Sequence, residues 1–129
     1  NQLSPAKRPF HTIIPGFLTQ NNQPLGAFGV MGASMQPQGH LQVVVNLADY
    51  GMNPQSALDA PRWQFVAGNT VLLEESVPSL VMSQLARRGH NIQVSTGQGI
   101  FGKGQIILKI GDVILAASEP RADGLALAQ

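Results

Sequence analysis

Apolar residues fall along this chain in short runs that end at glycine or proline. From residue 25 to residue 30 the run is nearly continuous, which is typical of a short buried strand. From residue 40 to residue 50 the apolar positions recur at helical spacing instead, and Gly51 can adopt the left-handed conformation that ends a helix. The pattern predicts a strand, a glycine turn and then a helix that begins near Pro37, where the missing N–H costs nothing.

The remaining elements follow from the same periods and from the turn residues between them. Residues 10–19 are expected to form a strand, at a sheet edge or with a bulge because of Pro15. The strand at residues 25–30 should return antiparallel to it. This order predicts an α+β fold with one domain over residues 1–129, a mainly antiparallel sheet and helices on one of its faces. Further strands are expected at residues 63–66, 70–73, 91–95, 104–110 and 113–117, and further helices at residues 54–59 and 76–88.

Composition narrows the classes of function. The 129 residues are 43% hydrophobic and only 12% charged, whereas a freestanding domain usually carries about a quarter charged residues. We therefore expect much of this surface to pack against a partner or another segment. A net charge of +1 without a basic run argues against nucleic acid as a partner, and no apolar stretch is long enough to span a membrane. The absence of cysteine excludes a disulfide, a thiol nucleophile and a thiolate metal site. The chain opens on Asn1, as a processed piece of a longer chain would, and nothing in it assigns a compartment.

The glycine turn at residues 31–34 is the first candidate site. A strand that passes through such a turn into a helix start aims several free N–H groups at one spot, and such a spot binds an anion or a developing oxyanion. A tight turn between two core elements explains the same residues without any ligand. Ser34 fits a helix cap better than a nucleophile, because the turn lacks the final glycine of a nucleophile elbow.

Two other features that suggest chemistry have simpler explanations. Residues 97–102 match G-x-G-x-x-G, but a strand rather than a helix follows them, so a flexible loop is expected in place of a dinucleotide site. The histidines are scattered without metal-ligand spacing, so His11, His40 and His90 are expected on the surface or in loops.

Charged residues gather in two proline-containing motifs, at residues 59–62 and 119–124. Each motif places an arginine beside an acid and a proline, and structural ion pairs that hold loops are the expected role. Glu74 and Glu75 lie between a strand and a helix, where they should be solvated or should face the helix dipole.

Taken in order along the chain, these motifs resemble the C-terminal part of the small subunit of γ-glutamyltranspeptidases, a family that includes related acylases. The resemblance spans nearly the whole chain and rests on the order of the motifs more than on any one of them. They are Pro5-Ala6-Lys7-Arg8-Pro9, Gly32-Ala33-Ser34, His40-Leu41-Gln42-Val43, Asn46, Asp49-Tyr50-Gly51-Met52-Asn53, Asp59-Ala60-Pro61-Arg62, Leu73-Glu74, Arg88-Gly89-His90 and Ala117-Ser118-Glu119-Pro120-Arg121-Ala122-Asp123-Gly124.

The resemblance implies an N-terminal-nucleophile hydrolase with a four-layer αββα sandwich, shared between a large subunit and a self-cleaved small subunit. In that family a threonine opens the small subunit, its hydroxyl attacks the γ-glutamyl amide, and its own α-amino group acts as the base. The acyl-enzyme ester then passes to water or to an acceptor amine. The implied partners are the large subunit, the N-terminal part of the small subunit and a γ-glutamyl small molecule such as glutathione, with no cofactor and no metal.

Four positions of this chain correspond to site residues of the family. The family's pair of oxyanion glycines falls on Gly32 and Ala33, where backbone N–H groups do the work, so alanine can serve if its φ is compatible. The family's pair of serines that hold the glutamyl α-carboxylate falls on His11 and Thr12; the threonine keeps a hydroxyl and the histidine can donate a hydrogen bond. Asn1 cannot be the nucleophile, so this chain alone is expected to be inactive. The departures leave a second hypothesis open, a non-catalytic relative that acts as a binding or assembly module.

Overall fold

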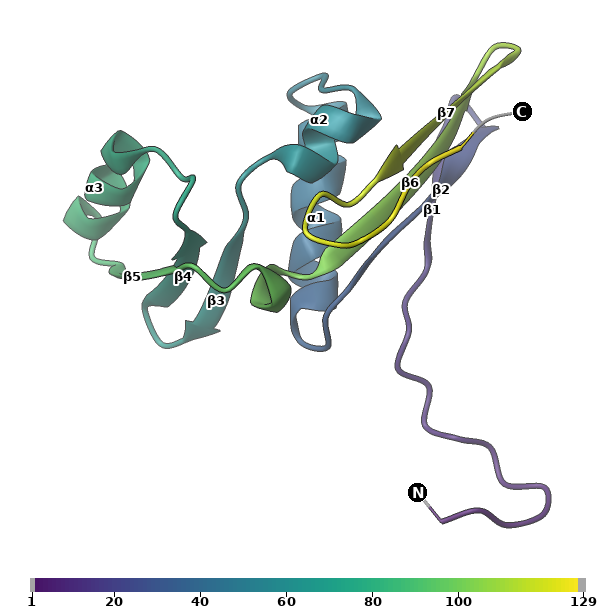
Figure 1. Ribbon diagram of the computed structural model, residues 1–129, viewed down its shortest axis with the longest axis horizontal. Helices are drawn as coiled ribbons and strands as arrows, with labels where there is room; N and C mark the ends of the chain where they lie inside the picture. The colour runs from purple at the N-terminus through teal and green to yellow at the C-terminus, as the bar shows by residue number, and fades with distance from the viewer. Residues whose placement is uncertain (1, 128–129) are drawn as a thin grey trace.

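Seven strands form two separate sheets in the computed structural model, which describes residues 2–127 (Figure 1). The larger sheet is antiparallel throughout and has the strand order β1-β2-β6-β7, so the first and last strands of the chain lie at its two edges. The predicted strands at residues 25–30, 104–110 and 113–117 are confirmed within this sheet. Its members are β1 (Gly16–Gln20), β2 (Gln23–Met31), β6 (Lys103–Ile110) and β7 (Val113–Ser118).

The smaller sheet is mixed, and its single parallel pair fits the predicted mainly antiparallel arrangement. It consists of β3 (Trp63–Ala67), β4 (Thr70–Glu74) and β5 (Asn91–Ser95), and β4 pairs antiparallel with β3 but parallel with β5. A parallel pair needs a crossover connection, and α3 (Ser79–Arg87) supplies it. This helix is shorter than the predicted 76–88, because a turn precedes it and its first residue follows Pro78.

Two helices cover one face of the larger sheet, as the sequence predicts. They are α1 (Met35–Ala48) and α2 (Pro54–Asp59), and Figure 1 shows both beside that sheet. In α2 the Asn53 side chain accepts a hydrogen bond from the N–H of Ser56, so this helix start has the expected cap. The core lies between the helices and the sheet and contains Phe28, Val30, Val43, Leu58, Ile106, Leu108 and Ala117. In residues 2–127 no helix is long and apolar enough to cross a membrane.

The first strand is shorter than predicted, because residues 10–15 are extended but unpaired. Pro15 has no N–H to give to a ladder, and pairing begins at Gly16. β1 is an edge strand with an irregular register between Leu18 and Thr19, which agrees with the predicted edge or bulge. Figure 1 shows the preceding segment running away from the sheet toward the N-terminus.

The segment at residues 97–102, where a loop is expected, contains one short helical turn. A short 3-10 helix (Gln98–Phe101) fills it, and the Phe101 side chain is completely buried. A strand follows directly, as predicted, so the turn lacks the helix that a dinucleotide site requires.

Candidate functional site

The bend between β2 and α1 leaves two adjacent backbone N–H groups free. Gly32 has a φ of 138° and Ala33 a φ of 50°, both in the region that favours glycine. The Gly32 carbonyl accepts from the N–H of Met35 at 2.9 Å, and the Ala33 carbonyl accepts from the N–H of Gln36 at 3.1 Å. Within residues 2–127, the N–H groups of Gly32 and Ala33 donate to no acceptor. The bend therefore has the donors that an oxyanion requires.

The same geometry corrects the expected cap. Ser34 already has helical dihedral angles and its side chain makes no capping hydrogen bond. Because the carbonyls of the bend accept the first N–H groups of α1, the helix does not need a serine cap there. Pro37 lies in the first turn, as predicted, although the helix begins at Met35.

Close packing against Gly102 fixes the bend. A Cβ atom on Gly32 would lie 3.0 Å from the Cα of Gly102, and one on Gly102 would lie 2.5 Å from the Met31 carbonyl oxygen. Neither glycine can gain a side chain without moving the backbone, so β2 and β6 hold the start of α1 in place.

The structure brings one of the two predicted substrate residues near this bend. The carbonyl oxygen of Thr12 accepts a hydrogen bond of 2.8 Å from the Nε2 of Gln36, in the first turn of α1. His11 and Thr12 are both exposed. Sequence reasoning missed Gln36; its position three residues after Ala33, at a helix start, was the available signal.

His40 has a structural role, which corrects its expected surface or loop position. It lies in α1, half-buried, and its Nε2 accepts a hydrogen bond of 3.0 Å from the N–H of Val30, while its ring packs on Phe28. β1 begins at Gly16, opposite Phe28, so no residue of β1 lies opposite Val30, and the His40 side chain accepts from its N–H instead. Burial lowers the pKa of His40 below its ordinary value, which favours the neutral form that can accept.

Replacing His40 by leucine is expected to lower the free energy of unfolding by about 1–3 kcal/mol, because the buried N–H of Val30 loses its acceptor. His40→Gln keeps an acceptor and should lose less. Since the folded-state pKa of His40 lies below the unfolded one, its contribution to stability is complete above about pH 6.5 and falls as the pH drops toward the folded-state pKa. Urea denaturation between pH 5 and 7 tests both the loss of stability and its pH dependence. A His40→Leu variant as stable as the parent would contradict the first, and one with the parent's pH slope would contradict the second.

A buried cluster of four charged residues joins the two arginine motifs to each other. Glu119 accepts from Nη2 of Arg62 at 2.7 Å and from Nη1 of Arg121 at 2.7 Å. Glu74 accepts from Nη2 of Arg121 at 2.6 Å and from the backbone N–H of Arg62 at 2.7 Å. The predicted ion pairs therefore exist: Glu119 pairs with Arg121 within its own motif and also with Arg62 of the other motif. Glu74 is buried, so its predicted solvated position is wrong.

The charges of this cluster compensate for its burial. Burial alone would raise the pKa of Glu119, but hydrogen bonds and charges from Arg121 and Arg62 hold it below its usual range. Burial would likewise lower the pKa of Arg121, and its two carboxylate partners raise it instead. Glu74 belongs to the smaller sheet and Glu119 follows the last strand of the larger one, so the cluster links the two sheets.

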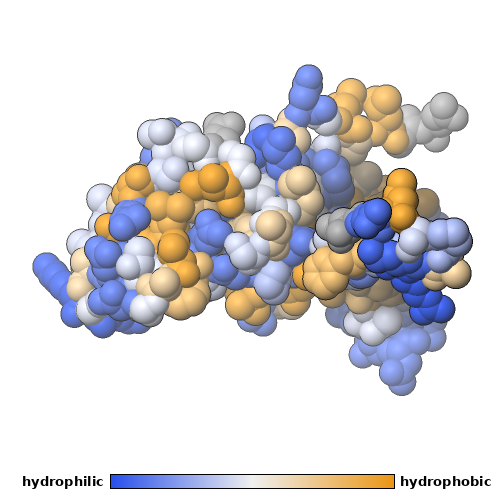
Figure 2. Space-filling model, turned by 90° about the horizontal axis from the view of Figure 1, so that it is seen from below, coloured by the Kyte–Doolittle hydropathy of each residue, from blue (hydrophilic) through white to orange (hydrophobic). Residues whose placement is uncertain are grey.

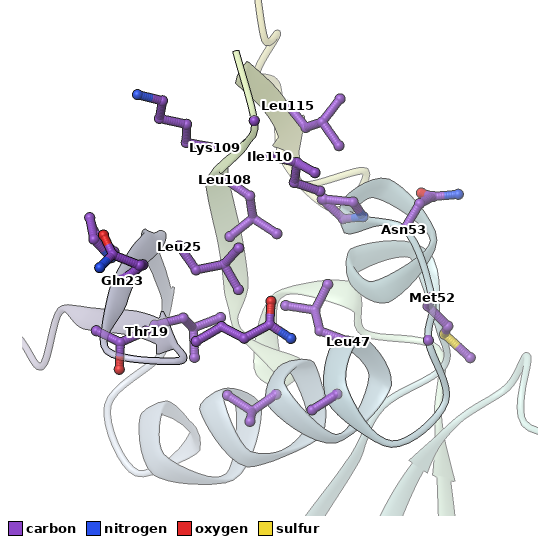
Figure 3. A pocket seen from close by; sticks show the side chains of 18 residues that line it. Thr19, Gln23, Leu25, Leu47, Met52, Asn53, Leu108, Lys109, Ile110 and Leu115 are labelled. Carbon is purple, nitrogen blue, oxygen red and sulfur yellow. The ribbon is translucent and has the colours of Figure 1, made fainter. Parts of the chain in front are cut away.

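Two cavities in the described part of the chain lie away from the bend. The larger, about 860 Å³, opens where the C-terminal end of α1 meets the larger sheet, and Figure 3 shows leucine side chains such as Leu25, Leu47 and Leu108 facing into it. Its lining holds a single charged residue, Lys109. A polar cavity of about 220 Å³ adjoins the buried charge cluster. Within the described residues no group of three or more histidines, cysteines or acids is placed to hold a metal ion.

Solved structures with the same arrangement define the class of protein. The chain aligns with a cephalosporin acylase from Bacillus halodurans at 54% identity and a TM-score of 0.87, covering 95% of this chain and 23% of that one. A γ-glutamyltranspeptidase from Pseudomonas nitroreducens, complexed with L-DON, shares the fold at a TM-score of 0.81 and 22% identity, over 100% of this chain and 68% of its own. The chain has the α+β fold of an N-terminal-nucleophile hydrolase and forms part of its αββα sandwich.

The family follows from comparison of sequences. The family model for γ-glutamyltranspeptidase matches residues 1–129, so this chain belongs to the γ-glutamyltranspeptidase family. The glutathione hydrolase-like YwrD proenzyme of Bacillus subtilis (strain 168) is 29% identical over 98% of this chain and 26% of its own length. The acylase ACY 1 proenzyme of Pseudomonas sp. (strain SE83) is 32% identical over 98% of this chain and 22% of its own. The chain thus spans about a quarter of the length of these curated relatives.

Proposed function

We propose that this chain is the C-terminal portion of the small subunit of an amide hydrolase or acyltransferase of the γ-glutamyltranspeptidase family. Gly32 and Ala33 supply the oxyanion hole, and His11 and Thr12 contact the acyl group. A threonine on a segment or chain outside this one supplies the nucleophile, so this chain alone is inactive.

The observation that carries the proposal is the pair of free N–H groups at the bend. When a hydroxyl attacks an amide carbonyl, the carbonyl oxygen becomes an oxyanion, and preorganised N–H donors lower the energy of that state. Gly32 and Ala33 have such donors at the end of a strand that the fold fixes on both sides. The contact between Gln36 and Thr12 places the proposed acyl-binding segment beside the same helix start.

An open apolar face on the larger sheet supports a partner polypeptide. Phe17, Ala27, Ile107 and Ala116 lie in register across its four strands, on the face opposite the helices. Phe17 is 61% exposed and Ile107 is 48% exposed. Burying such a row on a further layer would remove apolar area from water, as the large subunit and the N-terminal part of the small subunit would do in a four-layer sandwich.

A second apolar surface lies over the smaller sheet. Figure 2 shows hydrophobic side chains gathered at the end of the molecule that carries α3 and this sheet. The exposed apolar residues there include Phe65, Val66, Leu80, Val81 and Val94. α3 buries no residue at all, which is consistent with a helix that needs a further partner.

The substitutions at the site bear on the substrate and on the rival function. By the resemblance, His11 stands where the family has a serine and Ala33 where it has a glycine. Glutathione-type substrates are one candidate class. The likeness to acylases, and to an oxamate amidohydrolase proenzyme of Klebsiella pneumoniae at 25% identity, also supports a substrate with an acyl group other than γ-glutamyl. The same substitutions favour the second candidate, a non-catalytic binding or assembly module.

The residues that precede Asn1 in the complete protein distinguish these two functions. We expect a threonine that becomes an N-terminus by self-cleavage, and hydrolysis of γ-glutamyl-p-nitroanilide or another anilide by the cleaved protein. The 129-residue chain by itself should release no p-nitroaniline. A complete protein with no such threonine on either chain, which stays uncleaved and inactive, would favour the binding module.

A further inference from the structure

Gln36 contacts both parts of the proposed site. Its backbone N–H donates to the Ala33 carbonyl at 3.1 Å, which closes the bend. Its side-chain Nε2 donates to the Thr12 carbonyl at 2.8 Å, which holds the segment before β1. A single residue in the first turn of α1 therefore joins the oxyanion bend to the acyl-binding segment.

The contact with Thr12 stands alone. In the part of the chain that the structure describes, it is the one hydrogen bond between residues 2–15 and the rest of the fold; the other hydrogen bonds of this segment run from Lys7 to Gln2 and Ser4. All of residues 2–15 are exposed, so burial does not fix their position. An extended segment without another anchor samples many backbone conformations, and each ordered residue costs about 1–2 kcal/mol of conformational entropy.

We infer that Gln36 is a positioning residue, which sets where the His11–Thr12 segment lies relative to the bend at Gly32 and Ala33. This inference rests on the proposed function. The backbone N–H of Gln36 is independent of its side chain, so a change of side chain should leave the bend intact while it releases Thr12. Substrate binding should therefore weaken, whereas the chemical step after binding should change little.

Two variants of the complete protein remove the donor in different ways. Gln36→Met keeps a similar length without an N–H, and Gln36→Glu turns a carboxylate oxygen toward the Thr12 carbonyl. Gln93→Glu, on the exposed face of β5, is the control for added charge. We expect KM for the p-nitroanilide to rise by roughly threefold to tenfold in Gln36→Met, the effect of one hydrogen bond, and further in Gln36→Glu. The value of kcat should stay within about twofold of the parent, and the control should match the parent in both constants.

A structural role alone would give another result. If Gln36 only stabilised the helix start, its variants would lose active enzyme, so kcat would fall while KM stayed constant; that outcome would overturn the inference. Thermal unfolding of each variant shows whether the amount of folded protein has changed.

Limited digestion with trypsin tests the anchor without any turnover. Lys7 lies in the same segment as Thr12, which the Gln36 side chain holds. Release of this segment should speed cleavage after Lys7 in both Gln36 variants but not in Gln93→Glu. Equal cleavage rates in parent and variants would overturn the inference. A parent protein that hydrolyses no amide would instead refute the proposed function, and the digestion would still decide whether Gln36 holds the segment.

Discussion

Replacing Gly32 by alanine is expected to lower kcat of the complete protein by about 100-fold or more, while the protein still folds. The φ of Gly32 is 138°, which an alanine rarely adopts, and the new Cβ would lie 3.0 Å from the Cα of Gly102. Both effects turn or shift the N–H of Gly32. Removal of one oxyanion donor typically costs 10²–10³ in kcat, because the N–H must point at the place where charge develops. Steady-state kinetics with an anilide substrate, together with thermal unfolding, measures the effect.

Two control variants separate this effect from general strain. Gly68 has a φ of 58° and open space around its Cβ position, so Gly68→Ala places an alanine at a positive φ in a turn remote from the bend, without a clash. Its kcat should match that of the parent. Ala33→Gly relieves an unfavourable φ and keeps the N–H, so its activity should also persist. If Gly32→Ala retained the parent's kcat, Gly32 would not be part of the site.

The Glu119→Gln variant should lose about 3–5 kcal/mol of the free energy of unfolding. Glu119 is 1% exposed and accepts from the side chains of Arg62 and Arg121 and, at 2.6 Å, from the N–H of Gly104. Glutamine has nearly the same shape but no charge, so the guanidinium of Arg62, 2% exposed, would stay buried without an ion-pair partner. Urea denaturation followed by circular dichroism measures the change.

Glu75→Gln is the matched control for that substitution, because Glu75 is exposed and follows the buried Glu74 directly; it should change stability by less than about 0.5 kcal/mol. The pKa of Glu119 is lower in the folded protein than in the unfolded one, so its contribution is complete above about pH 4.3 and is lost as the pH falls toward the folded-state pKa. Glu119→Gln should remove that part of the acid sensitivity. If Glu119→Gln lost no more stability than Glu75→Gln, the charges of the buried cluster would contribute nothing to the free energy of unfolding beyond the packing of their side chains.

The elements were largely predictable because their signals are local. The helical spacing between residues 40 and 50, the Asn53 cap and the glycines that end runs act within one or two turns of chain. The errors occur where pairing partners decide the outcome. Residues 10–15 have the composition of a strand, but they pair with no other strand, because pairing begins only after Pro15. β5 pairs with β4 in parallel because α3 forms the crossover connection between them.

The candidate site was predictable in its residue types and not in its contacts. The Gly32-Ala33-Ser34 motif and the resemblance to a known family indicated an oxyanion bend, yet only the fold decides whether those amides stay free. Ser34 illustrates the limit, since its type suggested a cap that backbone carbonyls made unnecessary. His40 looked like a surface residue because the open N–H of Val30, ten positions earlier in the chain, is invisible in the sequence.

The sequence by itself determined the α+β class, most element boundaries and the bend at Gly32, since hydrophobic period and turn chemistry depend on neighbouring residues. The tertiary structure alone decided which charges meet. Arg62 pairs with Glu119, 57 residues away, rather than with the acid in its own motif, and Gln36 reaches Thr12 across 24 positions. Such contacts depend on how the two sheets and α1 pack, and packing brings together residues whose separation along the chain carries no signal of their proximity.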